Sequence, residues 1–376
     1  MIVPGADELA KVRELVLAHG WNSTAYQIVN PGIAHWFSAG GDAVAGLVDC
    51  GAVWMVAGAP IAPEARLEAV VQELESDAAQ RGASVCYMAA EGRLERLLRC
   101  RAAGCAFVTL GAQPCWRPAS WPRIVAAHGS LRAQLSRARN KGVVVSRWVA
   151  SRAQDHPALQ ACLAEWLATR GLPPLHFMTT PFTLGRILDR LVLVAERGGQ
   201  VIGFLVASPV PARRGWLVEQ IVRGAAAPNG TAELLVDAAF TAMIAAGSEY
   251  VTLGLAPLSM RAGVSGVVDP WWLRWMLRWA RAHGRRFYNF DGLDRFKAKF
   301  DPEWWDPMYA VTNQPAFRPR TLYAVAQAFS GNAPIALALS ALARAARQEL
   351  AWIIGGRSGR RSDGRTRQST NASGRT

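Results

Sequence analysis

The chain has 376 residues, of which 51% are hydrophobic, and its 42 Lys and Arg against 28 Asp and Glu give a formal net charge of +14. This hydrophobic content excludes disorder caused by low hydrophobicity, and the length allows one large or two ordinary domains. So basic a chain favours a polyanionic partner, either nucleic acid or an anionic membrane surface.

The cysteines and the apolar runs exclude several protein classes. The six Cys form no CxxC pair and have no His at ligand spacing, so we expect reduced thiols and no metal site. The first 21 residues hold no apolar stretch of signal-peptide length. No run approaches the ~18 consecutive apolar residues of a membrane span. We therefore expect a cytoplasmic protein, soluble or peripheral on the inner face of the cell membrane.

The first part of the chain alternates between predicted helices and strands. Apolar residues at helical spacing predict helices over residues 7–19, 64–81 and 92–103. Short apolar runs between Gly-rich turns predict strands over residues 33–38, 43–49, 52–58, 85–89 and 107–110. A meander of strands followed by alternating helices and strands is typical of an α/β domain.

The second part repeats this order after a predicted linking helix at 131–140. Helices are predicted over residues 157–170, 183–191, 233–246 and 270–283. Strands are predicted over residues 193–196, 201–209, 215–222, 250–255 and 287–290. Two Ala/Leu-rich helices, 322–329 and 335–354, follow, and the last twenty residues lack apolar periodicity.

The repeated order predicts an α/β (α+β) fold class with two copies of one fold in tandem. The expected division is a first domain at 1–125, a linking helix region at 126–149 and a second, catalytic domain at 150–320. C-terminal helices at 321–356 and a disordered basic tail at 357–376 complete the chain. Six Arg and one Asp lie in that tail, so part of the net charge belongs to it.

Three stretches hold candidate functional residues, and the first lies at 219–231. Glu219 and Arg223 end a predicted strand, and Asn229, Gly230 and Thr231 open the next helix. A turn before a helix N-terminus presents free backbone N–H groups to an anion or a carbonyl oxygen. An ordinary surface pair followed by an ordinary helix cap is the alternative interpretation.

The second stretch is the strand end at 252–259. Pro257 cannot continue a strand, so Ser259 is expected at the carboxyl edge of the sheet, where ligands of open α/β sheets usually bind. No His lies at motif spacing, so a hydrolase triad is not supported. The alternative role for Ser259 is that of a turn hydroxyl.

The third stretch, 287–305, interleaves aromatic and basic residues. It contains Tyr288, Asp291 and Arg295, and also Lys297 and Lys299, which are half of the four Lys in the chain. In a helix, Arg295 and Lys299 share one face, so the segment can present cations to phosphate. A solvated basic helix end is the alternative.

A predicted helix just before it carries two further stripes. Trp271, Trp275 and Trp279 repeat every four residues beside a stripe of basic residues: Arg274, Arg278, Arg281 and Arg285. Such a face can stack on nucleic-acid bases or lie at a lipid headgroup boundary. More often such Trp are core residues and such Arg are solvated.

Together these stretches resemble the catalytic C-terminal region of the phosphatidylglycerol lysyltransferases, the bacterial MprF-type aminoacyl-lipid synthases. The resemblance covers residues 20–315 and is carried by 56–60, 227–231, 253–259 and 287–300. It implies two tandem acetyltransferase-like (GNAT) domains. It also implies transfer of an aminoacyl group from aminoacyl-tRNA to a lipid hydroxyl, typically that of phosphatidylglycerol. The family's large N-terminal membrane region has no counterpart in these residues, so we expect a stand-alone module.

The resemblance also implies roles for individual residues. Glu219 matches an acidic strand residue near the aminoacyl amine, and Lys297 and Lys299 match a basic pair that binds phosphate or the tRNA end. Asp291 and Asp294 replace the Gln and Arg usual in the family, which leaves the identity of the amino acid open.

An aminoacyl-tRNA ester is already activated, so we expect no cofactor and no metal. The enzyme must align the lipid hydroxyl, assist its deprotonation and stabilise the oxyanion. Our hypothesis gives Glu219 or Asp291 the amine-binding or base role and the N–H groups near residues 229–231 the oxyanion. The cations that we expect to hold phosphates are Arg223, Arg295, Lys297 and Lys299.

The expected partners are thus aminoacyl-tRNA and an anionic phospholipid surface, which residues 335–354 could contact as an interfacial helix. Two alternatives stay open: an acyl-CoA-dependent N-acyltransferase on the same fold, and a non-catalytic module that binds tRNA or membrane.

Overall fold

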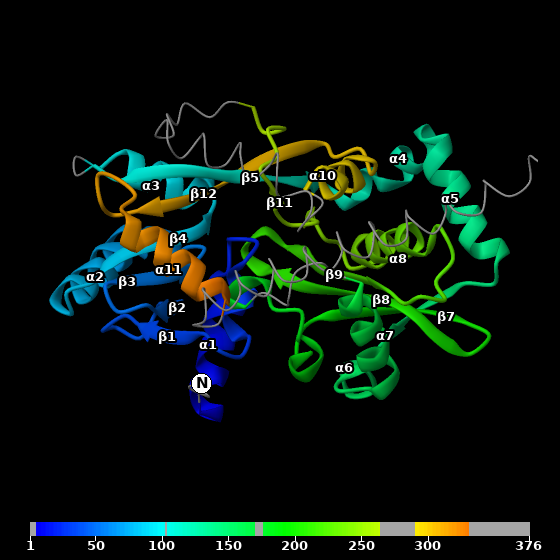
Figure 1. The fold of residues 1–376 in the computed structure, drawn as a ribbon, viewed down its shortest axis with the longest axis horizontal. Helices are drawn as coiled ribbons and strands as arrows, with labels where there is room; N and C mark the ends of the chain where they lie inside the picture. Colours follow the sequence, from blue (N-terminus) through cyan, green and yellow to red (C-terminus); the bar gives the residue numbers. More distant parts are fainter. Residues whose placement is uncertain (1–4, 102–103, 170–175, 264–289, 331–376) are drawn as a thin grey trace, which may run out of the picture.

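The computed structural model describes residues 5–101, 104–169, 176–263 and 290–330 (Figure 1). The predicted Trp-rich helix at 270–283, the helix at 335–354 and the tail at 357–376 lie outside the described residues. So does Tyr288.

The first half of the chain builds five strands with helices between them. Its helices are α1 (Ala6–His19), α2 (Leu67–Gln80) and α3 (Gly92–Arg99). Its strands are β1 (Ala34–Phe37), β2 (Val44–Asp49), β3 (Val53–Ala57), β4 (Ser84–Ala90) and β5 (Ala106–Trp116). Strands β1, β2 and β3 pair antiparallel, whereas β3 and β4 are parallel because α2 connects them. All seven positions of β4 are buried, as expected for a strand covered on both faces.

Two helices, α4 (Trp121–Ala127) and α5 (Gly129–Asn140), join the halves. The second half then repeats the order. Its strands are β6 (Val144–Trp148), β7 (Leu191–Arg197), β8 (Gln200–Val210), β9 (Gly215–Arg223), β10 (Tyr250–Thr252), β11 (Ala256–Pro257) and β12 (Trp304–Thr312). Its helices are α6 (Ala150–Ala153), α7 (Pro157–Ala168), α8 (Thr231–Ala245), α10 (Phe290–Ala298) and α11 (Pro319–Ser330). Strands β6 to β9 pair antiparallel, and β9 and β10 are parallel across α8.

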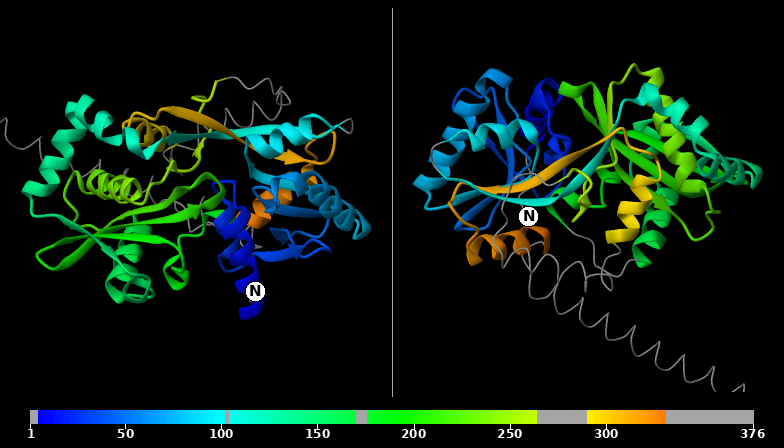
Figure 2. Two further views of the ribbon diagram at one scale, coloured as in Figure 1. Left: turned by 180° about the vertical axis from the view of Figure 1, so that it is seen from behind. Right: turned by 90° about the horizontal axis from the view of Figure 1, so that it is seen from above.

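Within the described residues, twelve strands form one sheet that runs through both halves. The order is β1-β2-β3-β4-β12-β5-β10-β9-β8-β7-β6, with β11 paired to β5 outside this path. The late strand β12 returns to the first half and inserts between β4 and β5. Figure 2 shows β5 and β12 crossing together from one half to the other. The two halves are therefore joined by backbone hydrogen bonds as well as by side-chain packing.

Helix α8 is buried on nearly every side because it lies between the sheet and α5. Its Leu235, Ala239 and Phe240 are fully buried, and Phe240 packs against Trp116 of β5 and Trp121 of α4. The same core includes Phe300, which follows α10. This packing places the start of α8 and the end of α10 together on one face of the sheet.

Several predicted elements need correction. Residues 183–191 are not a helix: a single 3-10 turn, Leu184–Arg186, precedes β7, which begins at Leu191. Phe290, expected at the end of a strand, begins α10 instead. The strand predicted to reach 255 stops at Thr252, because Gly254 takes a positive φ of 70° and turns the chain. Strands β6 and β12 were not predicted at all.

Candidate functional site

The candidate site begins where two parallel strands separate. Strands β9 and β10 pair only from Gly215 and Tyr250 to Leu217 and Thr252, and beyond this point they part. The pairing of β8 with β9 shifts register just past this point, so Glu219 forms a bulge without a partner in β8. The carboxyl ends of parallel strands are the usual ligand-binding edge of α/β sheets.

Lys297 of α10 contacts the loop that follows β10 at this edge. Its Nζ donates hydrogen bonds to the carbonyl oxygens of Gly254 and Leu255, each at 2.8 Å. The residue is only 7% exposed. Burial lowers the pKa of the Lys297 amine from 10.5 to about 7, although the negative charge of Asp294 opposes this shift.

Both charge states of the amine can make these two hydrogen bonds. A neutral Nζ has two hydrogens and one lone pair, and the two carbonyls accept the two hydrogens. The lone pair is then left to accept a proton. Since a general base works best with a pKa near the operating pH, Lys297 is a candidate for proton transfer.

Ser259 and Asp294 connect the loop after β10 to the same helix. The Ser259 hydroxyl donates to Asp294 Oδ1 at 2.7 Å, and Arg261 Nε donates to Asp294 Oδ2 at 2.8 Å. Ser259 is therefore close to Lys297 in the fold, as the sequence predicts for one edge of the sheet. Its hydroxyl is already used to fix α10 against the loop.

Lys299 lies near the N-terminus of α8. Its Nζ forms an ion pair with Glu233 Oε1 and sits 4.0 Å from the ring centroid of Phe296. The first turn of α8 and the end of α10 are thus tied together by charge. A carboxylate already neutralises the positive charge of Lys299, so this charge is not free to bind a phosphate.

Glu219 is also paired, with a residue that the sequence did not single out. Arg190 Nε lies 3.1 Å from one carboxylate oxygen of Glu219, and both side chains are buried, at 0% and 4% exposed. Arg190 also donates to Asn30 of the first half at 2.7 Å. Arg190 precedes a strand without any recognisable motif, so no local signal could have identified it.

The turn before α8 is packed rather than open. Gly230 has a φ of 98°, and a Cβ there would lie 2.2 Å from the Gln134 carbonyl oxygen of α5. The N–H and the hydroxyl of Thr231 both donate to the Pro228 carbonyl oxygen, at 3.2 and 2.7 Å. The hydrogen-bond donors of Thr231 are thus used within the turn itself.

The other predicted site residues lie around this edge. Arg223 and Asn229 are exposed at the two ends of the β9–α8 connection. Arg295 is exposed and its Nε donates to the Asp291 carbonyl oxygen at 3.2 Å, one turn earlier in α10. The structure therefore brings three of the predicted residues together: Lys297 lies on α10, Lys299 directly follows it, and Ser259 bonds to it through Asp294. Glu219 lies on β9 and pairs with Arg190.

A buried hydrogen-bond chain connects this site to the first half. The Ser23 hydroxyl donates to Gln113 Oε1 at 3.0 Å, and the Thr252 hydroxyl donates to the same atom at 3.4 Å. Thr252 in turn accepts from the Gly254 N–H at 3.0 Å. Since the Gly254 carbonyl oxygen accepts from Lys297, a residue of the first half helps to position the turn that holds the amine.

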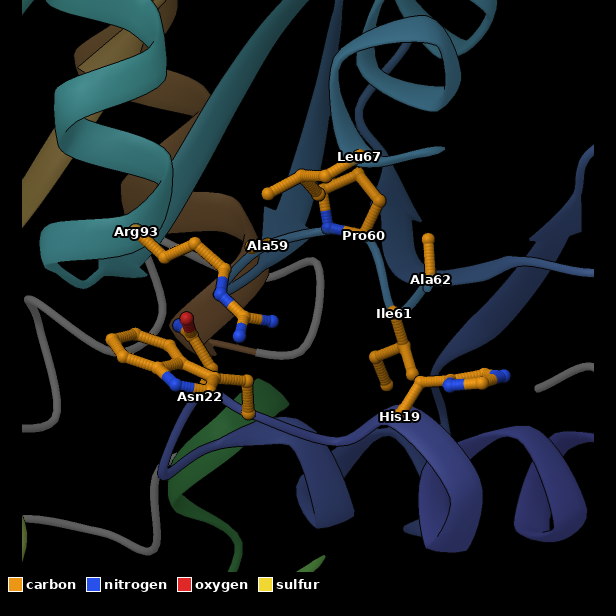
Figure 3. Close-up of a pocket in the computed structure, with 9 residues that line it drawn as sticks. His19, Asn22, Ala59, Pro60, Ile61, Ala62, Leu67 and Arg93 are labelled. Atoms are coloured by element: carbon orange, nitrogen blue, oxygen red, sulfur yellow. The ribbon is translucent and has the colours of Figure 1, made fainter. Parts of the chain in front are cut away.

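A shallow pocket lies elsewhere, in the first half (Figure 3). It is formed where β3 leads into α2 and includes Asn22, Pro60 and Arg93. Figure 3 shows Arg93 reaching from α3 toward the loop that carries Asn22. The Arg93 guanidinium lies 4.8 Å from the ring of Trp21. None of the sequence-predicted site residues lines this pocket.

Two absences hold for the described residues. No group of three or more His, Cys, Asp or Glu side chains there is arranged to hold a metal ion. No helix in those residues is long and apolar enough to cross a bilayer.

Comparisons with known proteins agree on one family. Residues 13–312 match the model of a family described as phosphatidylglycerol lysyltransferase, C-terminal. No curated protein matches the chain.

Solved structures share the fold. The C-terminal domain of a lysylphosphatidylglycerol synthetase from Agrobacterium fabrum is 24% identical, with a TM-score of 0.72 over 87% of this chain and 98% of that one. L-PGS from Bacillus licheniformis is 19% identical, with a TM-score of 0.70 over 91% of this chain and 98% of that one. Together with the similar order of elements in the two halves of the sheet, these likenesses confirm the expected α/β fold class.

Proposed function

This chain belongs to the phosphatidylglycerol lysyltransferase C-terminal family, and we propose that it moves an aminoacyl group from aminoacyl-tRNA to the hydroxyl of phosphatidylglycerol. Membership makes it a lysylphosphatidylglycerol synthetase-like domain of a lipid-modifying transferase family. The RNA donor, the choice of lipid and the roles of individual residues are the proposed part.

The observation that carries this proposal is the state of Lys297. A buried amine with a pKa of about 7, held by the Gly254 and Leu255 carbonyls at the carboxyl edge of the sheet, is a base available at neutral pH. Two other groups that could act as a base are already held in ion pairs: the Glu219 carboxylate pairs with Arg190, and the Glu233 carboxylate pairs with Lys299. Lys297 therefore replaces Glu219 as our candidate for the base.

The proposed step balances as an ester exchange. Neutral Lys297 takes the proton of the glycerol hydroxyl while the hydroxyl oxygen bonds to the ester carbonyl carbon of the aminoacyl-tRNA. The tetrahedral intermediate then breaks its bond to the ribose oxygen, and this oxygen receives the proton from Lys297. The aminoacyl ester is transferred and the base is regenerated.

The remaining charges around the site fit anionic substrates. We assign the exposed Arg223 and Arg295 to contacts with phosphates of the lipid or the RNA end. The N-terminal end of α8 offers a partial positive charge to the oxyanion, and we assign this role to the N–H groups of its first turn other than that of Thr231, which donates to the Pro228 carbonyl oxygen. Tyr288 stays a proposed contact from the segment between β11 and α10.

The test is product formation with radiolabelled aminoacyl-tRNA mixtures and total lipid, with and without ribonuclease. We expect labelled lipid that disappears after ribonuclease treatment, at a rate that rises with pH around a midpoint of about 7. Lys297→Met should reduce the rate by about 10²–10⁴-fold. Lys11→Met, which removes a lysine over the Phe37 ring in the first half, is the matched control.

Other outcomes identify the rivals. Transfer that needs acyl-CoA and ignores ribonuclease would indicate an N-acyltransferase. Binding of tRNA or vesicles without product would indicate a non-catalytic module. Labelled lipid in the presence of one aminoacyl-tRNA alone would name the amino acid. A peripheral position on the inner face of the cell membrane follows from this proposal, because tRNA is cytoplasmic and the acceptor is a membrane lipid.

A further inference from the structure

A long acid-free segment joins the two halves. No Asp or Glu lies between Glu95 and Asp155, although this segment contains ten Arg and Lys141. Several of these cations are matched by carboxylates from other parts of the chain. They are Arg99, Arg101, Arg117 and Arg139, which pair with Glu95, Glu75, Glu303 and Asp237.

Five of the seven other cations lie on α5 and the elements next to it, and the remaining two are Arg96 of α3 and Arg152 of α6. Within the described residues, no carboxylate pairs with the side chains of a set that we call the α5 surface. This set consists of Arg123, Arg132, Arg137, Lys141 and Arg147, all of them exposed. Arg132 Nη1 bonds to the Val125 carbonyl oxygen at the end of α4, which holds its guanidinium at the helix junction without neutralising its charge.

The α5 surface adjoins the candidate site. Leu131, Leu135 and Ala138 form the buried face of α5 and pack with the core of α8. The close approach of Gly230 to the Gln134 carbonyl places α5 directly against the turn that opens α8. Figure 1 shows α4 and α5 at the end of the molecule beyond α8 and α10. A chain of phosphates lying along α5 would therefore lead toward the carboxyl edge of the sheet.

The composition of the exposed face distinguishes nucleic acid from membrane. Helices that lie in a bilayer interface insert large apolar side chains such as Trp, Phe and Leu. The large apolar residues of α5, Leu131 and Leu135, are buried against α8, and its exposed positions are Arg, Ala, Ser and Asn. Cations without apolar anchors suit a sugar-phosphate backbone, which is bound through its charge and stays hydrated.

We propose that the α5 surface binds the backbone of the donor RNA and directs its aminoacylated end to Lys297. This proposal rests on the proposed function for the nature of the ligand, and it adds the place where that ligand is held. The helix that joins the two halves is then a binding element as well as a connection.

The test compares two double variants with the same change in charge. Arg137→Glu/Lys141→Glu alters the α5 surface, whereas Arg197→Glu/Arg320→Glu alters exposed cations on the β7–β8 turn and on α11. The probes are deacylated tRNA over a salt series and vesicles of phosphatidylcholine with phosphatidylglycerol. We expect the first variant to bind tRNA at least about tenfold more weakly than the wild type. The slope of log affinity against log salt concentration should also become less steep, by about two. The second should change tRNA affinity by less than about threefold.

Three results would overturn the proposal. Equal loss of tRNA affinity in both variants would show an effect of net charge alone. Loss of vesicle binding instead of tRNA binding in the first variant would assign the surface to the membrane. Unchanged tRNA affinity in the first variant would remove the surface altogether.

The failure of the proposed function would look different. Wild-type protein that binds tRNA through the α5 surface but forms no aminoacyl lipid would retain this inference and reject the transfer reaction. If the wild type forms the product and Arg137→Glu/Lys141→Glu has an unchanged KM for aminoacyl-tRNA, the transfer reaction is retained and the role of the α5 surface is rejected.

Discussion

Arg190 and Glu219 form a buried ion pair in which the guanidinium Nε donates to both carboxylate oxygens, at 3.1 and 3.2 Å. The other nitrogens of Arg190 donate to the Arg186 carbonyl and to Asn30 Oδ1. The pair therefore joins β9 to the first half of the chain. Glu219 has a structural task next to the site, whatever it contributes to binding an amine.

Glu219→Gln should destabilise the protein by about 3–5 kcal/mol, because it leaves the Arg190 charge buried without a counter-charge. Urea unfolding followed by circular dichroism measures this. The double variant Arg190→Met/Glu219→Leu should cost clearly less than Glu219→Gln, since it removes both charges together. A double variant as unstable as the single one would show that the charges are not coupled.

Thr252 should control the proton affinity of Lys297 through the Gly254 turn. Thr252→Val keeps the shape but removes the acceptor of the Gly254 N–H, so the two carbonyls that hold Nζ lose their alignment. Because carbonyl oxygens favour the charged amine, we expect the Lys297 pKa to fall further below 7 and the rate at neutral pH to drop. Mass spectrometry of the pH-dependent labelling of Lys297 by an amine reagent reads the pKa without an activity assay.

Two variants control the Thr252 experiment. Thr252→Ser retains the hydroxyl and should restore the wild-type labelling midpoint. Ser208→Ala removes another fully buried hydroxyl, one that has no partner among the described residues, and should leave the midpoint in place. A midpoint that shifts equally in all three variants would reject the role of the turn.

Stability should depend on pH through Lys297 with a defined sign. Its pKa falls from 10.5 in the free side chain to about 7 in the fold, so between these values the unfolded chain binds more protons. The free energy of unfolding of the wild type should therefore rise with pH across this window. In Lys297→Met this rise should be missing. The stability of the variant relative to that of the wild type should therefore be highest below pH 7.

Urea unfolding of both proteins at about pH 6 and about pH 9 checks this sign. The comparison of the two pH values cancels the pH-independent cost of leaving the Gly254 and Leu255 carbonyls without a donor. A difference between wild type and variant that is the same at both pH values would mean that Lys297 stays charged in the fold.

Gly230→Ala should separate α5 from the start of α8. The new Cβ would lie 2.2 Å from the Gln134 carbonyl, a backbone atom that cannot move aside alone. Gly82→Ala is the matched control, because Gly82 also has a positive φ, 73°, but nothing lies within 4 Å of its Cβ position. We expect a cost of about 1 kcal/mol for the control and about 1–3 kcal/mol more for Gly230→Ala. If thermal unfolding shows the same loss of stability for both variants, α5 moves away from the new Cβ without a measurable cost.

Much of the fold could be predicted because its signals are local. The helical spacing of apolar residues predicted α2 and α8 within a few residues, and α/β alternation with two similar halves predicted the fold class. Strand β12 escaped prediction because it contains Pro307 and its partners β4 and β5 lie far away in sequence. The prediction of a helix over 183–191 was wrong because Leu184 and Ile187 pack against Val192 and Val194 of β7 from a loop with a single turn.

The candidate site divides in the same way. By itself, the sequence determined that Lys297 and Lys299 lie two residues apart among aromatic residues and that the loop holding Ser259 follows a strand end, because residue types and strand ends are properties of neighbouring residues. Only the tertiary structure decided that Lys297 is a buried amine held by two carbonyls while Lys299 is bound to Glu233. It also decided that Glu219 belongs to Arg190. Burial and charge pairing depend on residues brought together from distant parts of the chain, and these set the pKa and the free charge of each group.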